Sequence, residues 1–195
     1  MSTVSEAKVA LRQQLRAEAG RHTAIELMEA SRAICARIQE QRVWREANSV
    51  LFYVPLSTEP DLQPLIHTAL ATRKTVALPR YDASAGTYQV CRITDPKGQL
   101  VSGQYAIPEP SLECPVVELN KLDLAVVPGI GFTLDGCRLG RGKGHFDRIL
   151  GQVQGWKCGV AFDWQVIVEI PAEPHDIRLD SIVTPSHWHV VRERL

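Results

Sequence analysis

The chain has 195 residues, 45% of them hydrophobic, which is enough for one compact core and too short for two comfortable domains. Its 22 basic and 22 acidic residues cancel, so no overall positive field would recruit nucleic acid or an anionic membrane. Five scattered cysteines without a CxxC pair argue against a disulfide framework and a structural zinc site. The polar N-terminus does not have the pattern of a signal peptide, and no apolar run is long enough to span a bilayer. We therefore expect one soluble domain over residues 1–195, located in the cytoplasm, without nucleic-acid or membrane partners.

Two amphipathic helices are predicted at the start of the chain. A capping box at Thr3 precedes a helix over about residues 4–19, and a second capping box at Thr23 starts a helix that runs to about residue 41. The polar side of the first helix carries a basic row, namely Lys8, Arg12 and Arg16. Taken alone, such a row is typical of a solvated helix face.

The remainder of the chain alternates short apolar runs with helical patterns. A helix is predicted over residues 62–70, and an extended loop over residues 98–110. This alternation favours a three-layer α/β/α fold with a mainly parallel, Rossmann-like sheet. Strands are predicted at residues 49–54, 75–78 (ended by Pro79), 87–93, 124–127, 157–162 and 188–191.

The most informative stretch runs from residue 126 to residue 150 and reads VVPGIGFTLDGCRLGRGKGHFDRIL. An apolar strand closes on Pro128, a glycine-rich loop follows, and helical spacing resumes at Phe146. Gly140, Gly142 and Gly144 leave the backbone free to adopt positive φ and allow a ligand to approach without a Cβ in the way. Successive free N–H groups in such a loop form a concavity that suits an anion.

Most charged residues of this loop are basic, which favours binding of a polyphosphate. Asp147 is the exception, because a carboxylate would repel phosphate unless a divalent cation lay between them. The local pattern therefore predicts a loop that binds a nucleoside triphosphate with magnesium, and the alternative is a solvated basic turn with structural glycines. The loop matches neither a Walker A sequence nor the GxGxxG spacing of dinucleotide sites. Four cations lie within eleven residues: Arg138, Arg141, Lys143 and Arg148.

The string LGRGKGHFDR, preceded by VVPGIGFTLDGCR, resembles the signature of the 5-formyltetrahydrofolate cyclo-ligase family, also called methenyltetrahydrofolate synthetase. The resemblance covers the whole chain, with its sharpest motifs in the last third. It implies a fold shared with sugar-phosphate isomerases and coenzyme-A transferases. It also implies an ATP- and magnesium-dependent ligase that cyclises 5-formyltetrahydrofolate to 5,10-methenyltetrahydrofolate and releases ADP and phosphate, through phosphorylation of the formyl oxygen.

The resemblance assigns the phosphates of ATP to the glycine-rich loop and to the first helix. Lys8 and Arg12 are expected to reach the nucleotide, as the Lys-x-x-x-Arg that opens the family does. Arg141, Lys143 and Arg148 are expected to act in catalysis by neutralising charge. The full set expected around ATP also includes Arg138, the backbone from Gly140 through Gly142 to Gly144, and Asp147.

Four further residues are expected to contact the folate. Glu59 resembles the glutamate of the family's S-x-E segment, and Arg80 and Tyr81 stand where the family carries a pair after the second strand. His145 replaces the first tyrosine of the family's Tyr-Tyr and keeps a planar ring with a hydrogen-bonding tip, but becomes titratable near neutral pH. Glu109 belongs to a segment similar to the family's Gly-Ile-x-Glu-Pro element and is expected to be no more than a pocket wall.

The resemblance also suggests two metal ligands. Asp147 is expected to hold magnesium. The stretch from Pro171 to Asp180, with His175 and Asp176 inside it, resembles another family element, and Asp180 is expected to reach the metal from the far side of the phosphates.

Two other functions remain open from the sequence. One is a family paralogue with a different substrate or a nucleotide-binding regulatory role. The other is a relative of the sugar-phosphate isomerases or coenzyme-A transferases, which would need no ATP. We expect a monomer, with a dimer as the alternative.

Overall fold

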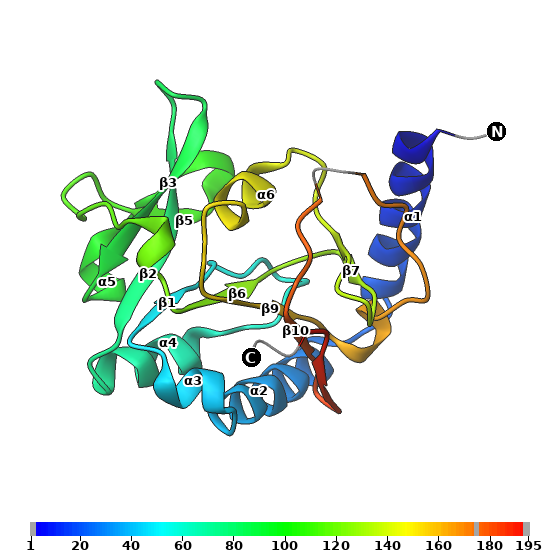
Figure 1. Cartoon of the computed structure of the whole chain (residues 1–195), viewed down its shortest axis with the longest axis horizontal. Helices are drawn as coiled ribbons and strands as arrows, with labels where there is room; N and C mark the ends of the chain where they lie inside the picture. The colour runs from blue at the N-terminus through cyan, green and yellow to red at the C-terminus, as the bar shows by residue number, and fades with distance from the viewer. Residues whose placement is uncertain (1–2, 174–175, 193–195) are drawn as a thin grey trace.

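The protein is built on a seven-stranded sheet with the strand order β11-β10-β9-β6-β1-β2-β3 (Figure 1). The computed structural model describes residues 3–173 and 176–192. The five inner strands run parallel, and β3 and β11 pair antiparallel at the two edges. The mainly parallel sheet predicted from the sequence is therefore confirmed. The strands are β1 (Ser49–Leu51), β2 (Thr75–Asp82), β3 (Thr87–Ile93), β6 (Leu124–Val127), β9 (Trp156–Val160), β10 (Ser181–Val183) and β11 (Trp188–Val190).

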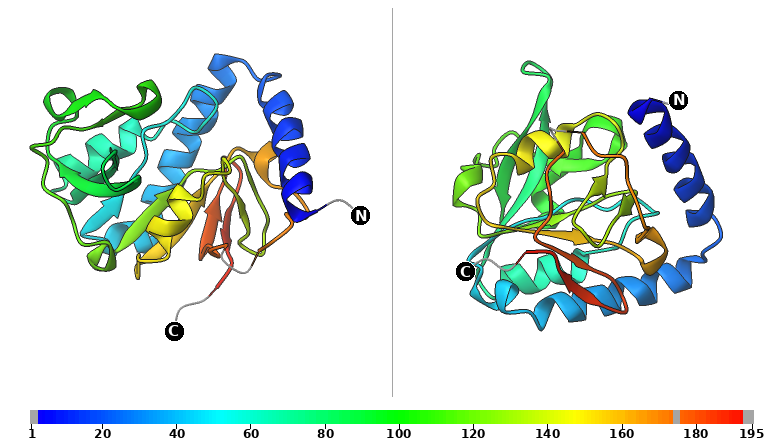
Figure 2. Two further views of the ribbon diagram at one scale, coloured as in Figure 1. Left: turned by 90° about the horizontal axis from the view of Figure 1, so that it is seen from above. Right: turned by 45° about the vertical axis from the view of Figure 1, so that its right-hand side comes forward.

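Helices cover both faces of this sheet. On one face, α2 (Ala24–Gln39), α3 (Arg42–Glu46) and α4 (Gln63–Ala71) share a buried cluster with alternate residues of the strands. On the other face, the short helix α6 (His145–Leu150) shares a second cluster with the intervening residues. Figures 1 and 2 show these layers on opposite sides of the strands, as the predicted α/β/α architecture requires.

The first helix, α1 (Val4–Ala19), stands beside the sheet and does not lie on either face (Figure 2). Both halves of the predicted capping box are present at Thr3, and the same holds at the start of α2. Leu15 is the main buried contact of α1, and it packs against Ile130 and Leu139 of the glycine-rich segment. This contact brings the basic row of α1 to the loop that follows β6.

The prediction that Pro79 ends the second strand is wrong. β2 continues to Asp82 because β3 folds back on it as a hairpin and pairs Pro79 with Val90. The Val90 carbonyl accepts the N–H of Val117 on the opposite side, so Pro79 occupies a position where the β2–β3 ladder needs no donor.

Other elements were not predicted, or are shorter than predicted. The first strand ends at Leu51 and not at residue 54, and residues 98–110 are not a plain loop. The glycine-rich segment contains a two-stranded hairpin. The unpredicted elements are α3, β10, the hairpin strands β7 (Gly131–Phe132) and β8 (Arg138–Leu139), then α5 (Pro96–Gln99), β4 (Leu100–Ser102), β5 (Pro108–Pro110), and the 3₁₀ turns η1 (Gln104–Ala106), η2 (Leu119–Lys121) and η3 (Asp163–Gln165).

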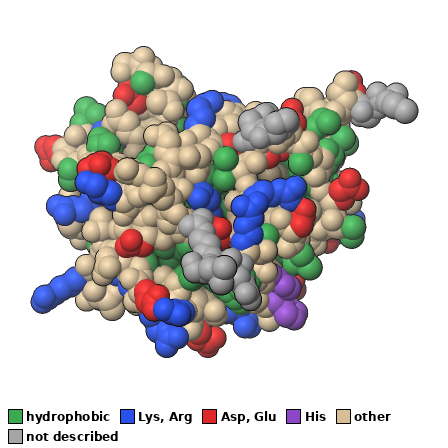
Figure 3. Space-filling model, viewed as in Figure 1, with side chains coloured by type: hydrophobic (Ala, Val, Ile, Leu, Met, Phe, Trp, Pro, Cys, Tyr) green, Lys and Arg blue, Asp and Glu red, His purple; other side chains and the backbone are tan. Residues whose placement is uncertain are grey.

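The structure also describes the cysteines, the surface charge and the longest helices. All five cysteines are buried and none forms a disulfide, and burial raises the pKa of Cys35 to about 11 and that of Cys158 to about 12. On the face shown in Figure 3, basic and acidic side chains are interspersed. Within residues 3–173 and 176–192, no helix is both long enough and apolar enough to cross a membrane.

Candidate functional site

A cavity of about 380 Å³ opens where β1 and β6 end, at the edge of the sheet where ligands gather in open α/β folds. Because β1 and β6 are adjacent and parallel, the loops that follow them meet at this edge. The loop after β6 contributes cations and glycines, and the loop after β1 contributes Tyr53, Val54 and Leu56 as an apolar wall. The lining comes from residues 53–59, 79, 88, 107–109, 128–129, 138–141 and 143–149, although not every residue of these ranges takes part.

The backbone of the glycine-rich loop adopts conformations that only glycine accepts readily. Gly142 has φ of 100° and Gly144, which precedes α6, has φ of 64°. Gly140 serves a different purpose, because a Cβ there would lie 2.9 Å from Nη1 of Arg138. The predicted conformational freedom is thus confirmed at two of the three glycines, while Gly140 is needed for close packing.

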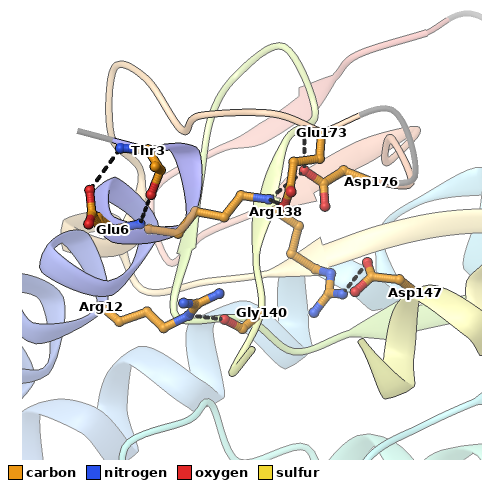
Figure 4. A network of polar contacts seen from close by, with 9 residues as sticks. Thr3, Glu6, Arg12, Arg138, Gly140, Asp147, Glu173 and Asp176 are labelled. Atoms are coloured by element: carbon orange, nitrogen blue, oxygen red, sulfur yellow. Dashed lines mark hydrogen bonds and ion pairs between the residues drawn. The ribbon is translucent and has the colours of Figure 1, made fainter. Parts of the chain in front are cut away.

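Arg138, expected to bind phosphate, lines the cavity and is also a buried strut beneath the loop. Its Nη2 donates to Oδ1 of Asp147 at 2.6 Å, and its Nη1 donates to the carbonyl of Pro128 at 3.2 Å. Its guanidinium also lies 5.9 Å from the ring centre of Phe146. Arg138 therefore ties the end of β6 to the first turn of α6, and Figure 4 shows it reaching across to Asp147.

Arg12 extends from α1 toward the glycine-rich loop, as Figure 4 shows, whereas Lys8 pairs with the segment that holds Glu173 and Asp176. Lys8 Nζ donates at 2.8 Å to carboxylates of both Glu173 and Asp176. Burial lowers the pKa of Lys8, but the hydrogen bonds that Lys8 donates to Asp176 and Glu173, with the charges of these carboxylates, more than offset it, so the pKa lies above its usual value. Arg12 Nε donates at 2.8 Å to the carbonyl of Gly140, and burial with the nearby Arg16 lowers its pKa. Both residues lie beside the loop but outside the cavity lining.

An ion pair joins the two loops across the mouth of the cavity. Arg141 Nη2 donates to Oε1 of Glu59 at 2.8 Å, and the other carboxylate oxygen accepts the N–H of Leu56 at 3.0 Å. The Glu59 side chain is 8% exposed, while that of Arg141 is 46% exposed. The structure thus brings together one residue predicted for the folate and one predicted for ATP, and both line the cavity with Lys143.

His145 lies in an aromatic cluster at the start of α6. Its ring centre is 5.0 Å from that of Tyr88 and 6.3 Å from that of Tyr81, both edge to face. Arg148 Nη2 lies 2.7 Å from Nδ1 of His145, and because a guanidinium only donates, Nδ1 is the acceptor and Nε2 carries the proton. Burial, together with Arg148 and Lys143, lowers the pKa of His145, which favours this neutral form. Arg148 thus orients His145 and does not itself line the cavity.

Arg80, expected to contact the folate, does not line this cavity. Successive side chains of a strand point to opposite faces, so the extension of β2 turns Pro79 toward the cavity and Arg80 away from it. Arg80 donates to the carbonyl of Ser111 at 2.6 Å and to the side chain of Gln89 at 3.1 Å. Arg80 therefore stabilises the edge of the sheet, whereas Tyr81 contacts His145, which lines the cavity.

Only one of the two expected metal ligands lines the cavity. Asp147 lines the cavity, but Asp180 does not; it is buried at the start of β10, where its Oδ2 accepts the N–H of Lys157 at 2.8 Å. His175, within the motif that suggested Asp180, lies outside the described residues. Within the described part of the chain, no group of three or more His, Cys, Asp or Glu side chains could hold a metal by itself.

Several lining residues were not predicted as site residues, Pro79 and Tyr88 among them, whereas Glu109 lines the cavity as the pocket wall that was expected. Tyr88 pairs directly with Tyr81 across the β2–β3 hairpin. The signal that could have revealed this contact was the turn at residues 83–86, between two strand-like runs, since it fixes the pairing register. For Glu109 the family-like segment indicated a pocket wall, and the exact position of the side chain depends on the pairing of β4 with β5.

Comparison with known proteins agrees with this geometry. Residues 4–185 match the 5-formyltetrahydrofolate cyclo-ligase family model. The chain is 36% identical over 145 residues to the 5-formyltetrahydrofolate cyclo-ligase of Escherichia coli K12, which covers 72% of this chain and 79% of that protein. It is 25% identical over 192 residues to the mouse 5-formyltetrahydrofolate cyclo-ligase, covering 93% and 95%.

Two solved structures are similar to the fold. The structure of Aquifex aeolicus 5,10-methenyltetrahydrofolate synthetase superposes with a TM-score of 0.86 at 30% identity, covering 96% of this chain and 94% of that one. A 5,10-methenyltetrahydrofolate synthetase from Mycoplasma pneumoniae superposes with a TM-score of 0.71 at 24% identity, covering 91% and 98%, which supports the shared fold alone.

Proposed function

This chain belongs to the 5-formyltetrahydrofolate cyclo-ligase family, and from that premise we propose how its cavity converts 5-formyltetrahydrofolate to 5,10-methenyltetrahydrofolate. Mg-ATP binds along the glycine-rich loop, and the folate lies against the apolar wall. The observation that carries this proposal is the composition of the cavity. One side is formed by Gly140, Arg141, Lys143 and Gly144, and the other by aromatic and aliphatic side chains. Such a cavity suits a polyanion beside a flat, largely apolar ring.

The cations around the loop supply what phosphoryl transfer demands of a protein, which is positioning and neutralisation of charge. Lys143 and Arg141 line the cavity and are assigned to the transferred phosphate. Arg12, fixed to the carbonyl of Gly140, lies beside the loop and is assigned to the outer phosphates together with Lys8. Arg138 and Arg148 act indirectly, since they hold Asp147 and His145 in place.

Asp147 fits a magnesium ion that arrives with the nucleotide. Mg²⁺ is usually held by one or two carboxylates, with phosphate oxygens and water as the other ligands. Asp147 lines the cavity, and within the described residues its hydrogen-bond partner is Arg138, at Oδ1, so Oδ2 can serve as a ligand. When bound, the metal would draw charge from the phosphate oxygens. We expect Asp147→Asn to raise the magnesium concentration needed for half-maximal activity; an unchanged requirement would remove Asp147 from the metal site.

The chemistry needs no covalent protein nucleophile, because the substrate provides its own. The formyl oxygen attacks the γ-phosphorus of ATP, an O–P bond forms, and the bond to the β-phosphate breaks to release ADP. N10 of the folate then attacks the formyl carbon, the C–O bond breaks, phosphate leaves with the former formyl oxygen, and N10 loses its proton. Lys143 and Arg141 stabilise the charge that develops on the phosphate in both steps.

The proposal is tested by the absorbance of the methenyl product with 5-formyltetrahydrofolate and Mg-ATP. Lys143→Ala should reduce turnover by at least about 100-fold without loss of folding, because it removes a cation at the reacting phosphate. Lys97→Ala, an exposed lysine of α5 outside the cavity, is the matched control and should behave like the wild type. If Lys143→Ala retains normal turnover, the loop is not the phosphate site.

We further propose that residues 1–195 act as one domain, as a monomer in the cytoplasm, and without nucleic-acid partners. The single sheet and the balanced charge support this proposal. Size-exclusion chromatography with light scattering tests the monomer. Family membership sets aside the alternative of an isomerase or coenzyme-A transferase that needs no ATP.

A further inference from the structure

Glu109 in β5 is a buried carboxylate that the mechanism above does not use. It is 5% exposed and lines the cavity. Its Oε2 accepts the N–H of Tyr81 at 2.9 Å. In the described part of the chain, Oε1 accepts no hydrogen bond, yet it is not among the fully buried atoms that lack a partner. Oε1 therefore retains some exposed surface, on a side chain that lines the cavity.

The pairing of β4 with β5 fixes the position of Glu109. β4 and β5 pair Val101 with Glu109, and Gly103 follows at the end of β4. A Cβ on Gly103 would lie 2.4 Å from Cδ of Glu109, so only glycine leaves room for the carboxylate. The N–H of Gly103 donates to the carbonyl of Ile107 at 2.9 Å, which holds this close approach.

Such a carboxylate has more acceptor sites than the described residues fill. An ionised carboxylate has about four acceptor sites, and burying it is costly unless donors satisfy them. Among the described residues, no lysine or arginine pairs with Glu109, and one backbone N–H is its hydrogen-bond donor. The open oxygen and the second lone pair of Oε2 match a ligand that presents two neighbouring N–H groups.

We propose that Glu109 determines specificity by accepting hydrogen bonds from the N3–H and 2-amino groups of the substrate's pterin ring. The inference rests on the proposed function, since this ring is the head of 5-formyltetrahydrofolate. Pro79, Tyr88 and Ile107 line the cavity beside Glu109 and provide apolar surface for the faces of the ring. A charged acceptor in an apolar slot selects strongly against a ring that lacks the matching donors.

Glu59 is the other carboxylate of the apolar side, and it is less suited to this role. Its Oε1 is engaged by Arg141 and its Oε2 by the N–H of Leu56. Glu109 has an oxygen available without breaking any contact. The two glutamates are thus assigned to different tasks, one to the mouth of the cavity and one to the head of the ring.

The test is Glu109→Gln. The carbonyl of the glutamine can still accept the N–H of Tyr81, but its NH₂ then faces the donors of the pterin. We expect the KM for 5-formyltetrahydrofolate to rise about 10- to 100-fold, since hydrogen bonds to a charged acceptor are lost. The KM for ATP and the melting temperature should stay close to the wild-type values. Glu113→Gln, exposed and in the same segment, is the matched control.

A substrate analogue separates recognition from a structural role. With 2-desamino-5-formyltetrahydrofolate, the wild type should show the raised KM, while Glu109→Gln should discriminate little between the analogue and the natural substrate. Equal discrimination by both enzymes would overturn the inference, as would an unchanged KM in Glu109→Gln. The wild-type assay with the natural substrate tests the proposed function independently, so an active wild type with an insensitive Glu109→Gln rejects this inference alone.

Discussion

The buried pair between Arg138 and Asp147 offers a direct test of how the loop is supported. Replacing Arg138 with methionine keeps a side chain about as long as the aliphatic stem of arginine but removes the charge and the donors. The change deprives Asp147 of its 2.6 Å partner and the carbonyl of Pro128 of its donor. Because Arg138 crosses from the end of β6 to α6, the loop should lose its anchor at both ends.

The size of the effect follows from burial. The Arg138 side chain is 4% exposed and that of Asp147 is 21% exposed. Removing one partner of a buried ion pair costs about 3–5 kcal/mol. Water reaches part of Asp147, so we take the lower end, about 3 kcal/mol. For a protein of this length, that loss corresponds to a fall in melting temperature of about 6–12 °C.

Thermal unfolding followed by circular dichroism measures this change. The matched control is Arg178→Met, because Arg178 pairs with Asp135 in an exposed ion pair whose side chains are 37% and 66% exposed. An exposed pair contributes about 0–1 kcal/mol, so the control should lose only a few degrees. If the two variants unfold at the same temperature, Arg138 is not the strut inferred from the structure.

Three further changes have defined outcomes. Asp180→Asn should lower the free energy of unfolding by about 1–3 kcal/mol in urea titrations, because the buried carboxylate of Asp180 accepts a backbone N–H of a neighbouring strand. The magnesium concentration needed for half-maximal activity should stay at the wild-type value, and a raised requirement would return Asp180 to the metal site. Gly142→Ala places a residue with a Cβ at a backbone φ of 100° and should raise the KM for ATP. The control is Gly86→Ala, which is strained at φ of 63° but lies in open space away from the loop, and its KM for ATP should stay at the wild-type value. Glu59→Gln should free Arg141 for phosphate and tighten binding of a non-hydrolysable ATP analogue about fivefold in calorimetry; weaker binding would contradict this coupling.

Elements whose signals are local could be predicted from the sequence. The capping box at Thr3 places the start of α1, and continuous apolar runs locate β1 and β6 because strands buried on both faces need no polar alternation. The glycine loop was also predictable, since positive φ at Gly142 and Gly144 requires glycine. Such features depend on residues a few positions apart.

Contacts that depend on tertiary pairing could not be predicted. Glu59 and Arg141 are 82 positions apart, and neither residue indicates the other. The sequence shows that Arg80 follows an apolar run, but only the hairpin with β3 reveals that the strand continues and turns this side chain away. Arg138 was grouped with the phosphate-binding cations because its charge is visible in the sequence, whereas its burial is not.

The partners of these cations also limit how the site can work. Arg141 is held by Glu59, and Arg12 by the carbonyl of Gly140. A triphosphate that takes Arg141 must therefore separate it from Glu59, which leaves a carboxylate with 8% exposure without its cation. A donor on the folate could restore that balance. Binding of either substrate should thus favour binding of the other, and the free energy of this coupling is set by the pair at the mouth of the cavity.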